Sequence, residues 1–369
     1  MKAFCVDVNP NILVWAREEA GYQAPEIAEY LNTDDATVSQ WERDGKSVRY
    51  SDLSKLAKKY KRQVPVFFLK QTPQRVKKPN DYRNLNINSK GLHPDTLLAI
   101  RRTSRYLEFY KDLSDKSIIE EQYSWLDNVR DPAIATADYI RQILEVPISE
   151  QRKKKNQTFN FWRTKFEEKL GIFVFQFPIK DGDFDGFSYM DNGKPYAVTV
   201  NNKVTEKRKV FTLFHELGHI IEGDAGLCLT IERNSSTFMG IESKCNTFAA
   251  QFLMPKSEVQ KPSTFEEVGK FADSLGVSKE AYLIRTKSLG LISDGDFNQY
   301  MAILRQINAK IKKKPKSGFA IPRDVVSRSQ RGDRFFDFVV DTYQANKVSP
   351  TIVRDLLDMK VVGLGRSQE

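Results

Sequence analysis

Two histidines and a glutamate within a short apolar stretch are the residues of this chain whose spacing could do chemistry. They form the sequence His215-Glu216-Leu217-Gly218-His219. Apolar residues recur at helical spacing around it, which predicts a helix over 208–221 with one side in a core. Residues four apart share one face of a helix, so both imidazoles can reach a single ion. Glu216 is rotated to face the open side of that ion.

The surroundings of this motif favour a metal site over an ordinary exposed helix. The whole chain has only 3 His, and two of them form this pair around a glutamate. Both lie inside an apolar helix, where burying two unliganded imidazoles would be costly and where an ion would satisfy them. The order His-Glu-x-x-His is the arrangement found in zinc peptidases.

A third protein ligand is expected, because catalytic zinc keeps three protein ligands and one position for water. Three downstream carboxylates are candidates: Asp224, Glu232 and Glu242. Glu242 is favoured, since it begins a second apolar helical stretch, 242–255, in which the small Ala249 and Ala250 would let two helices approach closely. The other two lie in a polar connection, where their alternative role is solvated loop charge. Asn246 is expected either to hydrogen-bond a ligand or to cap local backbone.

Strands are predicted only after Leu170. Residues 172–177, 187–189 and 196–200 are rich in strand formers, and turn signals separate them. Helical spacing of apolar residues dominates the remainder of the chain. The predicted fold class is therefore mainly α with a small antiparallel β-sheet (α+β).

A second pattern lies between residues 9 and 68, where four or five short helices are predicted without strands. In Asn32-Thr33-Asp34-Asp35, the asparagine suits a left-handed turn and the residues after it suit a helix cap. Two short helices joined by a tight turn have helix-turn-helix geometry. The segments 27–31, 36–43 and 53–57 resemble the helix-turn-helix of the phage-repressor (XRE) family.

That resemblance implies that the helix at 36–43 enters the major groove of DNA. Four of its side chains are the candidates for binding DNA or a partner: Thr37, Ser39, Gln40 and Arg43. Glutamine can read adenine and arginine can read guanine. Residues 1–70 hold 11 basic and 10 acidic residues, which predicts weak or partner-assisted DNA binding. The alternative is a module of the same fold that docks a protein, such as a repressor built alike.

Length and composition describe an ordinary globular protein. The 369 residues suggest two or three folded units. An odd number of cysteines, 3, without paired spacing excludes a disulfide framework and a four-cysteine metal site and fits a reducing compartment. No apolar run approaches the roughly 18 residues that cross a bilayer, so we expect a cytoplasmic protein that does not enter a membrane. The net charge of +10 is compatible with an acidic partner without identifying one.

Polar, proline-containing and basic stretches divide the chain into four predicted segments. They are a helix-turn-helix domain (1–70), a linker with a helical segment (71–160), a domain that carries the His-Glu-x-x-His motif (161–305), and a basic connector with a helical region (306–369). No role is assigned to the last segment.

The residues around the motif resemble a known family. The stretch 208–219, the later Glu242 and the sequence 245–255 are similar to the ImmA/IrrE metallopeptidases. The resemblance implies a zincin-like, gluzincin-like endopeptidase domain in which His215, His219 and Glu242 hold Zn²⁺ or another divalent ion and Glu216 is catalytic. It also implies regulated cleavage of a helix-turn-helix transcriptional repressor, which would release genes of stress response, prophage or mobile elements.

Two other classes of function are compatible with the sequence. One is a DNA-binding regulator or toxin–antitoxin component whose peptidase fold senses a metal or ligand without proteolysis. The other is a purely structural interaction protein, which would bind no metal. For an enzyme, the donor that steadies the oxyanion is expected to be a tyrosine or an arginine, since His93 lies in a polar stretch that favours a surface role.

Overall fold

The computed structural model describes residues 4–73, 92–129, 133–153, 158–180, 184–190, 193–223, 236–310 and 321–361. Contacts divide the chain into two compact units, one within residues 1–102 and one formed mainly by residues 103–369. Among the described residues, no helix is both long and apolar enough to cross a membrane.

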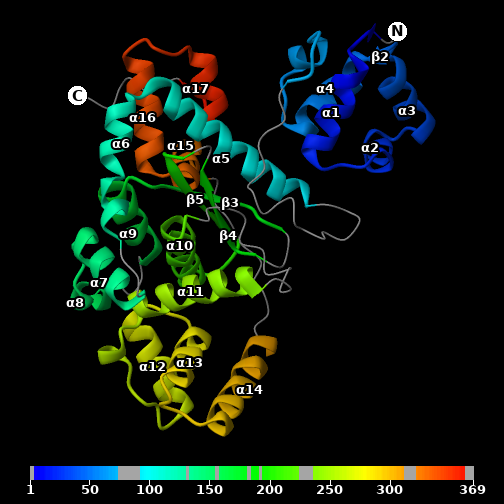
Figure 1. The fold of residues 1–369 in the computed structure, drawn as a ribbon. Helices are drawn as coiled ribbons and strands as arrows, with labels where there is room; N and C mark the ends of the chain where they lie inside the picture. The colour runs from blue at the N-terminus through cyan, green and yellow to red at the C-terminus, as the bar shows by residue number, and fades with distance from the viewer. Residues whose placement is uncertain are drawn as a thin grey trace. The chain divides into compact units, whose positions relative to one another are not determined.

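The first unit is a bundle of short helices around an apolar core (Figure 1). The elements are β1 (Cys5–Val6), α1 (Pro10–Ala20), α2 (Ala24–Leu31), α3 (Asp35–Asp44), β2 (Val48–Arg49), α4 (Tyr50–Tyr60) and the 3-10 helix η1 (Val64–Phe68). Apolar side chains at helical spacing meet in the core, which confirms the predicted helices. The antiparallel pair β1–β2 was not predicted, because two residues are too few for alternation to be visible.

The turn between α2 and α3 has the predicted geometry. Asn32 is left-handed, with φ 53°, and the Asp34 carboxylate caps α3 by accepting a hydrogen bond of 2.6 Å from the Thr37 amide. Arg17 of α1 donates to the carboxylate of Glu42 on α3 at 2.6 and 2.9 Å, so a part-buried ion pair holds the two helices together.

The second unit begins with helices and then forms one sheet. Its elements before the sheet are the part of α5 (Pro94–Leu113) from Thr103 onward, α6 (Lys116–Gln122), η3 (Ser124–Asn128), α7 (Ala133–Leu144), α8 (Ile148–Lys153), and α9 (Thr158–Lys165), which continues as the π-helical turn η4 (Phe166–Leu170). After the sheet come α10 (Glu206–Ile221), α11 (Ser236–Leu253), η5 (Lys256–Glu258), α12 (Phe265–Leu275), α13 (Lys279–Ser288), α14 (Asp294–Lys310), α15 (Arg323–Arg331), α16 (Asp333–Gln344) and α17 (Pro350–Leu357).

The sheet is mixed, which corrects the prediction of a wholly antiparallel one. Its strands are β3 (Phe173–Phe177), β4 (Gly186–Met190) and β5 (Tyr196–Asn201), in the order β3-β5-β4. The hairpin partners β4 and β5 are antiparallel, while β5 runs parallel to β3. Strand β5 lies between β3 and β4, a central position that the chain order alone does not reveal. The mainly α class with a small sheet is confirmed.

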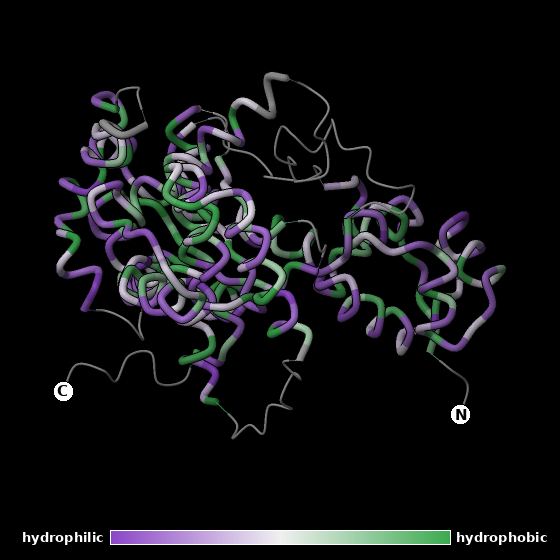
Figure 2. Tube along the Cα trace, turned by 90° about the horizontal axis from the view of Figure 1, so that it is seen from below, coloured by the Kyte–Doolittle hydropathy of each residue, from purple (hydrophilic) through white to green (hydrophobic). Residues whose placement is uncertain are grey.

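Helices cover both faces of this sheet (Figure 1). On one face, the Tyr106 ring of α5 contacts Phe175 and Phe177 of β3, and Thr103 and Thr199 share a buried hydrogen bond of 2.7 Å. On the other face lies α10, which packs against β4 and β5. Figure 2 shows apolar stretches inside this unit and hydrophilic stretches on its outer helices. The helix that carries the histidine pair is therefore part of the core.

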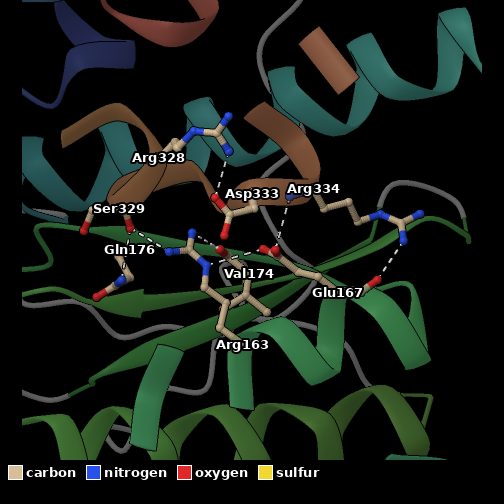
Figure 3. Close-up of polar contacts among 8 residues, drawn as sticks. All are labelled: Arg163, Glu167, Val174, Gln176, Arg328, Ser329, Asp333 and Arg334. Atoms are coloured by element: carbon tan, nitrogen blue, oxygen red, sulfur yellow. Dashed lines mark hydrogen bonds and ion pairs between the residues drawn. The ribbon is translucent and has the colours of Figure 1, made fainter. Parts of the chain in front are cut away.

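The C-terminal helices are joined to the sheet by a buried polar network (Figure 3). Arg163 of α9 donates to the carbonyls of Val174, at 2.5 Å, and Ser329, at 2.7 Å, and pairs with Glu167 at 3.4 Å. Glu167 in turn accepts the backbone N–H of Arg334 at 3.3 Å. Both members of the ion pair are buried, so each compensates the charge of the other where water cannot.

The two ends of this network give a prediction about stability. Arg163→Met leaves Glu167 buried without its partner, so we expect a loss of about 3–5 kcal/mol in the free energy of unfolding of the second unit. Arg328→Ala is the matched control, because Arg328 pairs with Asp333 and Asp337 at the surface, where such pairs contribute about 0–1 kcal/mol. Urea unfolding of the full chain measures both. Equal losses in the two variants would contradict the role of the buried pair.

Candidate metal centre

Helix α10 places the motif on its buried side. The helix spans Glu206–Ile221, two residues more than predicted at its start, and its apolar residues Leu213, Phe214 and Leu217 are fully buried. His215 is 8% exposed and His219 is 2% exposed. Because the apolar residues bury this helix on several sides, both imidazoles lie in the interior, where they need polar partners.

Helix α11 approaches α10 closely at Gly218, where any side chain would be crowded. A side chain at Gly218 would place its Cβ 3.0 Å from the Cα of Cys245 and 3.1 Å from its Sγ. Nearby, Phe214 of α10 stacks on Phe252 of α11 with ring centroids 4.1 Å apart. The helix begins at Ser236, earlier than predicted, so Glu242 lies inside it rather than in its first turn. This close approach sets Glu242 opposite the two histidines.

Three donor atoms converge from the two helices. The Nε2 atoms of His215 and His219 are 3.2 Å apart. Glu242 Oε1 lies 3.2 Å from His219 Nε2, and its Oε2 lies 3.4 Å from His215 Nε2. Tetrahedral zinc with bonds of about 2.0–2.1 Å requires donor atoms roughly 3.3 Å apart. The separations and the donor types therefore fit one zinc ion, and one ligand atom from each residue can be chosen within 4.8 Å of the others.

Asn246 contacts one of the two histidines. Its Oδ1 lies 3.1 Å from His215 Nδ1, so Nδ1 donates this hydrogen bond and Nε2 faces Glu242 and His219. Of the two roles considered for Asn246, the structure shows the contact to a histidine of the triad.

The pKa values of the two carboxylates at the site, Glu216 and Glu242, are shifted in opposite directions. Burial raises the pKa of Glu216, which is 1% exposed, although the charges of His219 and His215 oppose this shift. Burial would also raise the pKa of Glu242, but hydrogen bonds and charge from both imidazoles hold it well below its usual range. Glu242 is thus suited to remain an anion beside a cation, and Glu216 to exchange a proton.

One oxygen of Glu216 carries further information. Among the described residues, its Oε2 is buried and has no hydrogen-bond partner. An unpaired carboxylate oxygen in the interior is unfavourable unless a ligand or water completes it. An oxygen in this position could accept a hydrogen bond or a proton from a water molecule bound at the site.

Other residues considered from sequence lie elsewhere. Asp224 and Glu232 fall outside the described residues. His93 lies at the start of α5, where its Nδ1 accepts a hydrogen bond of 3.1 Å from the Asp95 amide, so it has a local structural role.

Cys245 was not predicted at the site, yet its buried thiol adjoins His219. Burial raises the pKa of this thiol, and a hydrogen bond with the His219 imidazole opposes the rise. Its position three residues after Glu242, one helical turn, was the available signal.

The helix-turn-helix candidates lie on α3 in the first unit. Ser39, Gln40 and Arg43 are exposed, and Thr37 is half-buried at the capped start of the helix. Exposed carboxylates also belong to α2, α3 and the turn between them: Glu26, Glu29, Asp34, Asp35 and Asp44. The near-neutral charge of this unit is therefore unevenly distributed, with acidic side chains next to the residues that would read DNA.

Comparison with known families agrees with both patterns. Residues 167–287 match a peptidase family described as the IrrE N-terminal-like domain, and residues 13–67 match a helix-turn-helix family. The chain thus joins a helix-turn-helix region to a region similar to the IrrE N-terminal-like peptidase domain. The match to the IrrE-like domain spans η4 to α13 and includes every residue of the triad, while α14 to α17 lie beyond it. No curated protein matches the chain.

The contact between Asn246 and His215 gives a second prediction. Asn246→Ala removes the acceptor that orients the imidazole, so we expect zinc affinity to fall about 10–100-fold. Competition with a chromogenic chelator measures the affinity. Thr247→Ala is the control, since Thr247 is exposed and its hydroxyl donates to the Ser243 carbonyl of its own helix. An unchanged affinity in Asn246→Ala would remove this residue from the metal centre.

Proposed function

We propose that this protein is a zinc-dependent endopeptidase of the gluzincin type that cleaves a helix-turn-helix transcriptional repressor. The observation that carries the proposal is the set of three donor atoms, 3.2–3.4 Å apart, on helices α10 and α11. His215, His219 and Glu242 would hold the ion. The unpaired oxygen of Glu216 supports an enzyme over a purely structural metal site.

The chain's own residues account for the proton transfers of peptide hydrolysis. When bound, zinc would polarise the scissile carbonyl and make water more acidic. Glu216 would take the proton of the attacking water and return it to the leaving amine. Its buried position raises its pKa, which suits a group that must both accept and release a proton near neutral pH. Asn246 would keep the His215 ring in the tautomer that presents Nε2.

The substrate is inferred from the domain that shares the chain. A helix-turn-helix unit on the same polypeptide would bring the peptidase to a repressor, or to the operator that the repressor occupies. Cleavage would then release genes of stress response, prophage or mobile elements. Such a substrate places the reaction in the cytoplasm.

The catalytic role of Glu216 is the third prediction. On co-expression with a repressor encoded beside this protein, the wild type should produce one specific cut. Glu216→Gln should bind zinc as the wild type does and cleave at least about 10²-fold more slowly, because only the proton acceptor is lost. His215→Ala should lose both the zinc and the cut. A repressor that stays intact under inducing conditions, although zinc is bound, argues against proteolysis.

A second candidate function, a DNA-binding regulator that senses a metal or ligand without proteolysis, is favoured by the exposure of Gln40 and Arg43 on α3. The neighbouring carboxylates limit the number of phosphate contacts. Counting Arg43, Lys46 and Arg49 as the exposed basic residues in and just after α3, the slope of log K against log salt should not exceed about 3 in magnitude.

Operator titrations at several salt concentrations test this fourth prediction. Arg43→Ala should weaken a specific complex by about 1–3 kcal/mol if this arginine reads guanine. Lys61→Ala, at the exposed end of α4, serves as the control. An operator complex that forms without any proteolysis and whose slope stays within about 3 in magnitude would support the regulator in place of the enzyme. A steeper slope would contradict the count of three phosphate contacts.

A further inference from the structure

Strand β4 presents alternate side chains to the two faces of the sheet. Tyr189 points toward α5, because its hydroxyl donates to Ser104 Oγ at 2.9 Å. Gly186 faces α10, where an added side chain would collide with the methyl group of Thr212. Successive residues of a strand point to opposite faces, so Ser188 faces α10 together with Gly186.

On α10, Glu216 lies on the same side of the helix as Thr212, which contacts the strand at Gly186. Thr212 and Glu216 are four residues apart and therefore lie on one face of the helix, one turn from each other. Gly186 and Ser188 are likewise neighbours on one face of the strand. With Gly186 against Thr212, the strand and the helix set Ser188 beside Glu216. Burial raises the pKa of the Glu216 carboxyl, and the nearby Ser188 hydroxyl opposes that rise.

Both side chains hold a buried polar atom without a partner. Ser188 is 0% exposed, and among the described residues neither its Oγ nor Glu216 Oε2 has a partner at hydrogen-bonding geometry. Directly opposite Ser188 on β5 is Val198, which is fully buried and offers no polar side-chain atom. Burial of an unsatisfied hydroxyl is unfavourable. One unsatisfied donor and one unsatisfied acceptor thus face each other across the interface between β4 and α10.

We propose that Ser188 is a positioning residue for Glu216, its hydroxyl donating a hydrogen bond to the Glu216 carboxylate when a ligand occupies the metal centre. The inference rests on the proposed peptidase function and adds a residue to it. A bond to one oxygen would fix the rotation of the carboxylate and aim the other oxygen at the reacting proton. A small rotation of Glu216 or Ser188 would make this bond, because they occupy facing positions.

The test uses the full chain loaded with Co²⁺ and acetohydroxamate as the probe. The hydroxamate binds a metal and presents an acidic proton to a neighbouring carboxylate, and its binding changes the visible spectrum of the cobalt. We expect Ser188→Ala to take up one cobalt as the wild type does and to bind acetohydroxamate about tenfold more weakly, as for loss of a hydrogen bond to a charged group. Ser188→Thr, which keeps the hydroxyl, should restore binding to within about twofold of the wild type.

A double-mutant cycle separates positioning from a general structural effect. In Glu216→Gln, the addition of Ser188→Ala should cause little further loss, because the two residues act on the probe as one unit. Thr199→Val is the matched control: it removes a buried hydroxyl from the neighbouring strand on the opposite face of the sheet, where Thr199 contacts Thr103. It should leave acetohydroxamate binding unchanged.

The outcomes distinguish this inference from the proposed function. If the wild type binds cobalt and acetohydroxamate and Ser188→Ala binds the probe equally well, Ser188 has no positioning role and the metal centre stands. An equal loss in the wild-type and Glu216→Gln backgrounds also overturns the inference. A wild type that takes up no cobalt overturns the metal centre itself, and the inference with it.

Discussion

The close contact between α10 and α11 is the constraint on which the metal centre depends. Gly218 lies between the two histidines, and the Cα of Cys245 lies only 3.0 Å from where a side chain at Gly218 would begin. At that separation, Glu242 reaches both Nε2 atoms and Asn246 reaches His215 from the same helix. A wider spacing between the helices would separate Glu242 from the two buried imidazoles, and burial of imidazoles without polar partners is unfavourable.

The remainder of the second unit supports that contact from outside. Trp162 of α9 packs edge-on against Phe214 and Phe252, the pair that stacks across α10 and α11. The same helix carries Arg163, whose buried network holds the C-terminal helices to β3. The C-terminal helices, which lie beyond the region matched by the peptidase family, therefore contact α9, the helix that packs against the metal centre. This gives residues 321–361, for which the sequence suggested no role, a structural one.

The first unit shows why a charge count is a weak guide to a partner. Residues 1–70 are nearly neutral in sum, yet α2 and α3 expose several carboxylates while α4 exposes Lys55 and Lys58. Association with DNA depends on the charges near the contacting helix rather than on their total. The family match identifies the fold of this unit, and the distribution of charge on that fold decides which partner it favours.

The sequence by itself determined the parts of this protein that are encoded locally. The spacing of His215, Glu216 and His219 within one apolar helix predicted their shared placement, and Asn32 and Asp34 predicted the turn and cap of the helix-turn-helix, because each feature depends on neighbouring residues only. Tertiary structure decided which distant carboxylate joins the histidines, that β5 is the central strand, and that Ser188 faces Glu216. Those outcomes depend on the packing of segments far apart in the chain, where strand order and helix separation follow from the fit of whole surfaces rather than from periodicity.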